Sequence, residues 1–435
     1  MAEAMPLARS FARTRWGLRF RDRAALLRWQ EARLARFLAR ALPAAAFYRD
    51  YAGRPLEELP IVDKATMLAR FEDFNTRGIS LEQATAVAAA AERSRDFAET
   101  LDGVTVGLSS GTSGTRGVFL VGPEERARWA GILLARLLSS GSLRQLLSPG
   151  RAPLHVAFFL RANSTLYTTL GSRRLRFEYH DLLLPLAEHV DRLNAAPCHV
   201  LVAPPTVLRR LADAQGRGDL RIAPRQVLSV AEVLEEDDAR AVMAAFGVPA
   251  QQVYQCTEGF LGYSCRMGRV HLNEEYVHIE PEWLDAEHRR FHPIVTDFSR
   301  ETQLIVRYRL DDVLRLADGA CPCGRHSLAL AAIDGRADDV LWATRRDGFP
   351  VAVFPDVVRR AFVLAGGAVR DYRLEQHGDE WRIRIDGEGN AFASARGELE
   401  RLCHRLEVRP PRLSVELWRN EPPDEKRRRI RCVSR

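Results

Sequence analysis

The sequence has no apolar run of the length that a membrane-spanning helix needs, about 20 residues, so no membrane span is expected. Its arginine-rich N-terminus, residues 1–23, is not followed by the apolar segment of a secretion signal. The seven cysteines are an odd number. Together with the missing signal, this is typical of a protein from a reducing compartment. We therefore expect a cytoplasmic protein.

Lysine is also scarce, and arginine far outnumbers it. The net charge of the chain is +7. A moderate positive charge suits nucleotides, acidic proteins or nucleic acid, and does not choose among them. The densest basic run, residues 426–431, has no interleaved aromatic residues. The chain also lacks zinc-finger spacing and RNA-binding signatures. No nucleic-acid partner is expected, and the run is compatible with a solvated basic tail.

A chain of 435 residues, 46% of them hydrophobic, predicts two or three domains with one sizeable core. Short apolar runs at 156–160, 199–203 and 226–230 alternate with helical stretches such as 207–214. This alternation predicts an α/β domain with largely parallel strands. A helix is also expected over 24–48.

A separate small unit is expected after Gly335, because the pattern restarts there with elements of α+β type. The expected elements are helices at 355–364 and 391–406 and strands at 370–375, 381–386 and 412–418. The sequence therefore predicts a large N-terminal α/β domain, residues 1–335, and a small α+β C-terminal domain, residues 336–435.

The most informative stretch is the loop Ser-Ser-Gly-Thr-Ser-Gly-Thr-Arg-Gly at residues 109–117. Its glycines give flexibility and its N–H and O–H groups are donors for phosphate oxygens. It is not a Walker loop, because the Gly-Lys-Ser/Thr ending is missing. The candidate phosphate-binding residues are Ser109, Ser110, Gly111, Thr112, Ser113, Gly114, Thr115 and Arg116.

Further motifs follow downstream in a fixed order. The segment 254–258 reads Tyr-Gln-Cys-Thr-Glu, and its hydroxyl and carboxylate suit a phosphate and Mg²⁺. The segment 307–312 reads Arg-Tyr-Arg-Leu-Asp-Asp, whose acids suit ribose hydroxyls. Cys-Pro-Cys-Gly-Arg at 321–325 leads into Asp-Gly-Arg-Ala-Asp-Asp at 334–339.

The order of these segments resembles the adenylate-forming superfamily, which contains acyl- and aryl-CoA ligases and enzymes that load carrier proteins. The resemblance covers almost the whole chain and is closest to the phenylacetate–CoA ligase branch and the related coenzyme-adenylating synthetases. It implies ATP and Mg²⁺ as cofactors and a mobile C-terminal domain. In such enzymes, positioning and charge stabilisation carry the reaction.

The resemblance implies a role for individual residues. Thr257 contacts the α-phosphate or the acyl carboxylate, Glu258 ligates Mg²⁺, and Lys426 neutralises charge during adenylation. Asp338 is the hinge about which the small domain turns between two half-reactions. The other implied nucleotide contacts, to ribose, phosphate or adenine, are Ser229, Ala231, Glu232, Tyr254, Asp312 and Arg336.

Several positions depart from the family pattern. Arg116 stands near a position where lysine is frequent, Gln255 replaces a frequent glycine, and Asp311 replaces the usual glycine before the ribose-binding aspartate. Lys426 follows two acidic residues instead of glycine, so Arg427 competes with it for the catalytic assignment. A relative that has lost its chemistry and binds only nucleotide or nucleic acid stays an alternative.

Three cysteines and a histidine form a candidate zinc site: Cys265, His271, Cys321 and Cys323. Three thiolates and an imidazole are a natural tetrahedral set for zinc. Such a closed set leaves no position for a catalytic water, so the expected role is structural. Similar clusters in the phenylacetate–CoA ligase branch support the interpretation.

The carboxylic acid substrate is expected between the segment 156–170 and the strand ends at 229–258. Phe158, Asn163 and Tyr167 are candidate lining residues, with Phe159 and Ser164 beside them. Aromatic walls with a few polar groups favour a small aryl acid such as a hydroxybenzoate.

The expected acceptor is the phosphopantetheine thiol of an acyl carrier protein, as in the enzymes that prime aryl-polyene pigments. Coenzyme A is the alternative acceptor. Carrier proteins are acidic, and an arginine-rich surface steers them by charge.

Overall fold

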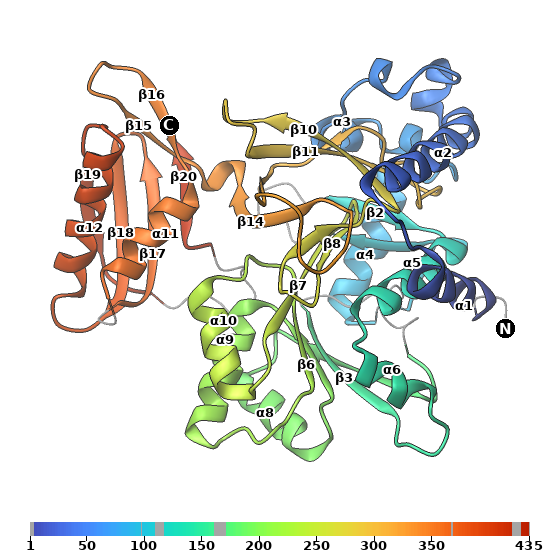
Figure 1. Ribbon diagram of the computed structural model, residues 1–435, viewed down its shortest axis with the longest axis horizontal. Coiled ribbons are helices and arrows are strands. Elements are labelled where there is room, and N and C mark those ends of the chain that lie inside the picture. The colour runs from blue at the N-terminus through green and yellow to red at the C-terminus, as the bar shows by residue number, and fades with distance from the viewer. Residues whose placement is uncertain are drawn as a thin grey trace. The chain divides into compact units, whose positions relative to one another are not determined.

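In the computed structural model (Figure 1), the chain folds into two compact units. It describes residues 4–96, 98–108, 117–160, 171–366, 369–419 and 428–434. The larger unit comprises Met1–Glu282, Pro293–Leu310 and Leu316–Ala331, and the smaller unit comprises Trp283–His292, Asp311–Arg315 and Ala332–Arg435. Among the described residues, no helix combines the length and the apolarity that a membrane crossing requires.

Five parallel strands form the centre of the larger unit. Their order is β4 (Leu175–Asp181), β3 (Leu154–Leu160), β5 (Val200–Ala203), β6 (Gln226–Ser229) and β7 (Ala250–Cys256). The helices between successive strands from β4 to β7 are α8 (Leu186–Ala195), α9 (Pro205–Arg217) and α10 (Glu236–Phe246). The predicted alternation of apolar strands and helices is thus confirmed, within a few residues at each end.

Both faces of this sheet are covered, because side chains alternate along each strand. Ala157 and Phe159 of β3 join the core beneath α8, α9 and α10. Val156 and Phe158 point to the opposite core, which α5 (Pro123–Leu137) covers. Continuous apolar runs are typical of strands that are buried on both faces.

The expectation of largely parallel strands is wrong for the other half of the sheet. Here each strand is antiparallel to its neighbour. β7 pairs with β8 (Gly259–Ser264), β8 with β9 (Val270–Leu272), and β9 with β14 (Ala329–Arg336). The reason is local: β7 reverses through the two-residue turn Thr257–Glu258, and a hairpin joins only antiparallel strands. A second hairpin pairs β1 (Thr105–Leu108) with β2 (Val118–Val121).

The first hundred residues are mostly helical. Their helices are α1 (Ala4–Ala12), α2 (Arg23–Ala41), α3 (Lys64–Ala69) and α4 (Leu81–Ser94). Further along the chain, α6 (Ser140–Leu147) follows α5. The predicted helix over 24–48 ends earlier, at Ala41, and tight turns follow. Pro43 explains the difference, since proline lacks the N–H that would continue the helix.

The C-terminal part of the smaller unit is a four-stranded sheet with two helices on one face, drawn in orange and red in Figure 1. The strand order is β19 (Arg412–Glu416), β18 (Glu380–Gly387), β17 (Val369–His377) and β20 (Ile430–Ser434). α11 (Pro355–Leu364) and α12 (Ala391–Arg405) pack on this sheet around Trp381. β15 (Leu341–Thr344) and β16 (Pro350–Val353) form a hairpin.

Two earlier segments of the chain complete the smaller unit. β11 (Arg290–Asp297) pairs with β13 (Asp312–Leu316) through Arg290 opposite Arg315. Arg290 also donates to the buried Asp334 at 3.0 Å and to Asp356 of α11 at 2.7 Å. Buried carboxylates need such partners, so this network holds α11 against the two segments.

The core around Trp381 gives a stability prediction. Trp381 is 1% exposed, so Trp381→Ala removes a large buried ring and is expected to cost about 3 to 5 kcal/mol. The control is Leu417→Ala in the same unit, because Leu417 is 84% exposed and its loss is expected to cost less than about 0.5 kcal/mol. Urea unfolding measures both, and equal losses would contradict the described packing.

Candidate active site

Two of the predicted motifs lie at the carboxyl ends of neighbouring parallel strands. Ser229 is the last residue of β6, and Thr257 and Glu258 directly follow β7. Ligands of open α/β sheets bind at such strand ends. The fold therefore puts both motifs where a substrate site is expected.

The Thr257–Glu258 turn is tightly built. The Thr257 hydroxyl donates to the Glu258 carboxylate at 2.8 Å. The next residue, Gly259, has no room for a side chain, because a Cβ there would lie 2.7 Å from an oxygen of Asp297. The glycine is thus required by close packing behind the turn.

Arg300 fixes this turn to the strand that leaves the glycine loop. Its guanidinium donates to the Thr257 carbonyl at 2.5 Å and to the Leu120 carbonyl at 2.8 Å, and it is only 8% exposed. Sequence reasoning missed Arg300, since one arginine in an arginine-rich chain carries no pattern.

Asp297 lies behind the turn and is fully enclosed. Burial raises its pKa to about 6, although the N–H and hydroxyl of Ser299 donate to the carboxylate at 2.8 and 2.6 Å. The carboxyl is therefore protonated below about pH 6 and ionises only above it.

One pocket is lined by residues from three of the predicted motifs of the larger unit. The lining residues come from four segments that are distant in sequence: Lys64, Met67, Leu68, Gly117, Val118, Phe119, Thr257, Glu258, Gln303, Ile305 and Tyr308. Gly117 is the last residue of the predicted phosphate loop, so this end of the loop and the Thr-Glu motif line the same pocket. Residues 109–116 of that loop lie outside the described residues.

Lys64 is the second residue that sequence reasoning missed. It begins α3, and backbone bonds from Val62 to Arg307 and Arg309 hold the preceding chain at 2.9 and 2.8 Å. A signal was present: among 64 lysine and arginine residues, only Lys64 and Lys426 are lysines.

The predicted adenine-flanking residues form a sharp turn after β6. Ala231 has a φ of +68°, which a residue with a Cβ rarely adopts. Glu232 accepts hydrogen bonds from the N–H and the hydroxyl of Thr206, at 3.3 and 2.5 Å, in the first turn of α9. Such strained turns cluster at ligand sites. Tyr254 is buried in β7.

In the smaller unit, the two acidic motifs come together. Arg336 lies 3.5 Å from the Asp311 carboxylate and 3.9 Å from Asp338, and the Ala337 N–H donates to the Asp311 carbonyl at 2.6 Å. Asp312 begins β13, and its carbonyl lies 2.8 Å from Nδ1 of His292. The predicted ribose and hinge residues are therefore neighbours.

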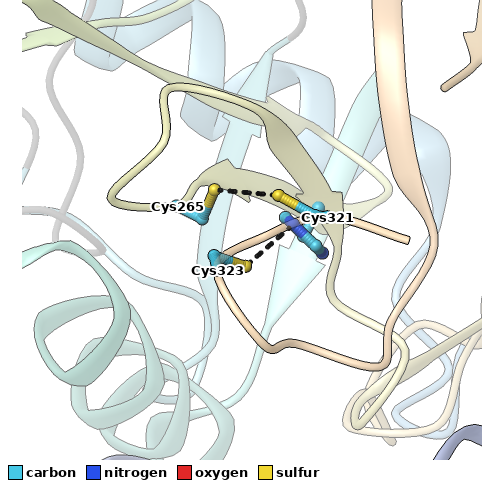
Figure 2. A group of neighbouring side chains, drawn as sticks. Cys265, Cys321 and Cys323 are labelled. Atoms are coloured by element: carbon cyan, nitrogen blue, oxygen red, sulfur yellow. Dashed lines mark hydrogen bonds between the residues drawn. The ribbon is translucent and has the colours of Figure 1, made fainter. Parts of the chain in front are cut away.

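The four predicted metal ligands converge in the larger unit, as Figure 2 shows for the three cysteines. Their ligand atoms all lie within 4.8 Å of one another. Sγ of Cys265 and Cys321 are 3.8 Å apart, and Sγ of Cys323 is 3.4 Å from Nε2 of His271. A tetrahedral zinc requires spacings of about 3.8 Å and about 3.5 Å for these two pairs.

The surroundings of the cluster also suit a metal. Nδ1 of His271 lies 3.0 Å from the Ser327 carbonyl, which leaves Nε2 directed at the cysteines. Backbone N–H groups of Met267 and Arg325 donate to Sγ of Cys265 and Cys323, each at 3.4 Å. Burial lowers the pKa of His271, which favours the neutral, metal-binding imidazole.

The predicted substrate-lining residues receive little structural support. Phe158 is 6% exposed and packs against Phe177 in the core, with ring centroids 5.0 Å apart. Asn163, Ser164 and Tyr167 lie outside the described residues, as does Lys426.

Comparisons with known proteins identify the fold. No model of a known protein family matches the chain, and no curated protein matches its sequence. Among solved structures, a 2-hydroxyisobutyryl-CoA ligase in the postadenylation state, in complex with R3-HIB-AMP, is 18% identical. Its TM-score is 0.61, covering 95% of this chain and 90% of that one. The GH3.15 acyl acid amido synthetase is 12% identical with a TM-score of 0.56, covering 90% and 86%.

These likenesses show that the chain shares its fold with a CoA ligase and an acyl acid amido synthetase. They confirm, at the level of fold, the resemblance that the ordered motifs carried. They also confirm the fold class, a large α/β part with a small C-terminal α+β part.

The buried Asp297 gives a pH prediction. Its pKa is about 6 in the folded protein against an ordinary 3.8, so the folded state binds more protons between these values. Its contribution to stability is complete below about pH 4 and is lost as the pH rises through about 6. Asp297→Asn cannot ionise, so it should gain about 2 kcal/mol relative to wild type between about pH 4 and pH 7.

Urea unfolding across this pH range measures the effect. The control is Asp219→Asn, because Asp219 is an exposed carboxylate in the same unit. If Asp297→Asn and the control show the same pH dependence, the raised pKa of Asp297 is wrong.

Proposed function

We propose that the protein activates a carboxylic acid with ATP and transfers the acyl group to a thiol. The carboxylate oxygen attacks the α-phosphorus of ATP, pyrophosphate leaves, and an acyl-adenylate forms. A thiolate then attacks the acyl carbon, and AMP leaves. The observation that carries this proposal is the pocket shared by Gly117, Thr257 and Glu258.

The larger unit supplies the phosphate side of the reaction. The loop 109–117 is proposed to hold the β- and γ-phosphates, and its anchor strands β1 and β2 are paired up to Leu108 opposite Val118. Thr257, held by Arg300, donates to the α-phosphate or the acyl carboxylate. Glu258 offers carboxylate oxygens, which Mg²⁺ prefers. Magnesium would there neutralise phosphate charge.

The two lysines of the chain are proposed to act on the same phosphates. The chain uses arginine at almost every basic position, so a lysine marks a place where the planar guanidinium is unsuitable. Lys64 lines the pocket with Glu258 and Thr257, where a compact ammonium suits a crowded phosphate site. Lys426 is proposed as the adenylation lysine of the small domain.

The smaller unit is proposed to recognise the ribose. The Asp312 carboxylate accepts the ribose hydroxyls, and Arg336, already beside Asp311, neutralises nearby negative charge. Ser229, Ala231 and Glu232 are proposed to flank the adenine, with Tyr254 beneath them in β7. Asp338 is proposed as the hinge, and residues 336–435 as the mobile domain.

The acid and the acceptor are proposed from the sequence. The acid is an aryl acid such as a hydroxybenzoate, and the acceptor is the phosphopantetheine thiol of an acyl carrier protein, which the net charge of +7 favours. Coenzyme A carries the same thiol and is the second candidate, because one similar structure is named as a CoA ligase.

Acid-dependent exchange of pyrophosphate into ATP tests the adenylation step across a panel of aryl and alkyl acids. Wild type is expected to exchange with aryl acids, whereas Lys426→Ala and Lys64→Ala should each lose about 100-fold or more, as lost charge stabilisation predicts. The control is Arg240→Ala, which removes an exposed basic residue from α10.

Two results would contradict the proposal. If no acid supports exchange of pyrophosphate into ATP, although the protein still binds ATP, the protein is a nucleotide-binding relative without adenylation activity. Exchange with alkyl acids alone would refute the aryl assignment. Offering the adenylated enzyme coenzyme A or an acyl carrier protein, at low and high salt, then identifies the acceptor, because a docked acidic protein is the more sensitive to salt.

We propose that the cluster of Cys265, His271, Cys321 and Cys323 binds one structural zinc. The spacing of the ligand atoms and the bond from His271 to Ser327 support it. The cluster joins β8 and β9 to the loop before β14, and Leu328 of that loop donates to Glu274 at 2.7 Å. Zinc would therefore fasten this loop to the sheet.

Elemental analysis of the purified protein tests the zinc site. About one zinc per chain is expected, with most of it lost in Cys321→Ser together with thermal stability. Cys403→Ser is the matched control, because Cys403 is a buried cysteine of α12 outside the cluster. Metal-free wild type with all four side chains intact would refute the site.

A further inference from the structure

Arg428 makes an unusual set of contacts just before β20. Its Nη1 donates to Asp338 at 2.8 Å, its Nε donates to Asp339 at 3.0 Å, and Nη2 also contacts Asp339. One guanidinium thus bridges two adjacent carboxylates, and it is 16% exposed. We call this arrangement of Arg428, Asp338 and Asp339 the clasp.

The clasp is built into the backbone around it. Asp339 is 8% exposed and accepts the Arg336 N–H at 2.7 Å. Gly335 has a φ of +132°, and a Cβ there would lie 2.7 Å from the Asp339 carboxylate. Burial raises the pKa of Asp339 and the charge of Arg428 opposes this rise, so the carboxylate depends on Arg428 to stay ionised.

The clasp is continuous with the proposed ribose site of the same unit. Arg336, whose N–H reaches Asp339, extends its guanidinium to 3.5 Å from the Asp311 carboxylate. The next residue, Ala337, donates its N–H to the Asp311 carbonyl at 2.6 Å. A connected set of hydrogen bonds therefore runs from Asp311 to Arg428.

The neighbouring arginine shows what a purely structural contact looks like here. Arg429 pairs with Asp371 at 3.1 Å and lies over the Tyr372 ring at 5.4 Å, both on β17. Arg429 therefore joins β20 to its own sheet. Arg428 instead contacts Asp338, the proposed hinge, and Asp339 beside it, and neither residue belongs to a strand of that sheet.

We propose that Arg428 is a positioning residue that couples the proposed ribose site to the hinge. The inference rests on the proposed function, and in particular on Asp338 as the hinge. The clasp fixes the backbone from 336 to 339 in one conformation. A turn at Asp338 moves its carboxylate away from Arg428, so the clasp opens when the domain rotates. One half-reaction uses the clasped hinge and the other the open hinge.

Nucleotide held at Asp312 and Arg336 would favour the clasp, because it immobilises one end of the same hydrogen-bond set.

The test measures the two half-reactions separately in the full chain. Pyrophosphate exchange reports adenylation, and release of AMP from a synthetic acyl-adenylate with added thiol reports transfer. In Arg428→Gln, the ratio of the two rates should change about tenfold, with a smaller change in Arg428→Lys. Asp339→Asn should shift the ratio in the same direction, since it opens the clasp from the other side.

A matched control and a second readout keep the result interpretable. Arg370→Gln removes an exposed arginine that bridges Asp386 and Glu388 in the same unit, and its ratio should not change. In Arg428→Gln, hydrogen exchange at the Arg336 amide should be about tenfold faster than in wild type. A folded variant with faster amide exchange but an unchanged ratio would make Arg428 merely structural and overturn the proposal.

Failure of the proposed function looks different from failure of the clasp. Wild type without exchange for any acid refutes the adenylation and, with it, a role in half-reactions. Active wild type, with both rates of Arg428→Gln lowered equally or not at all, refutes the clasp alone.

Discussion

A buried guanidinium holds together the candidate site of the larger unit. Arg300 reaches the carbonyls of Thr257 and Leu120, which belong to separate hairpins. A buried cation costs free energy unless it is hydrogen-bonded. If either carbonyl moved away, the guanidinium would lose a hydrogen bond while still buried. The positions of the Thr-Glu turn and of the strand that leaves the glycine loop are therefore fixed relative to each other. Close packing of Gly259 against Asp297 fixes the turn from behind.

The sequence predicted the elements that follow from periodicity. The parallel strands around 156–160, 199–203 and 226–230 and the α+β elements after residue 355 are present, because alternating and helical patterns report burial directly. The antiparallel half of the sheet was not predicted, since pairing direction depends on the turn after β7 and not on apolar pattern. β20 was interpreted as part of a basic tail, although Ile430 is buried in it against β17.

The candidate site could be predicted where a motif is continuous in sequence. The spacing of Cys321 and Cys323 indicates a metal site, and Cys265 and His271, which the sequence also predicted, lie beside them. Arg300, Lys64 and Arg428 were not found, because each acts through contacts between distant segments. Lys64 had a compositional signal, as one of only two lysines. Arg428 had none, because it stands in a run of three arginines.

The central claim is that a carboxylate attacks the α-phosphorus of ATP at this site. A carboxylic acid labelled with heavy oxygen in its carboxylate tests it most directly, by mass spectrometry of the nucleotide released after thiol transfer. The account predicts AMP that carries one labelled oxygen, because the oxygen that joined phosphorus leaves with it. Unlabelled AMP, or ADP with phosphate, would contradict the account.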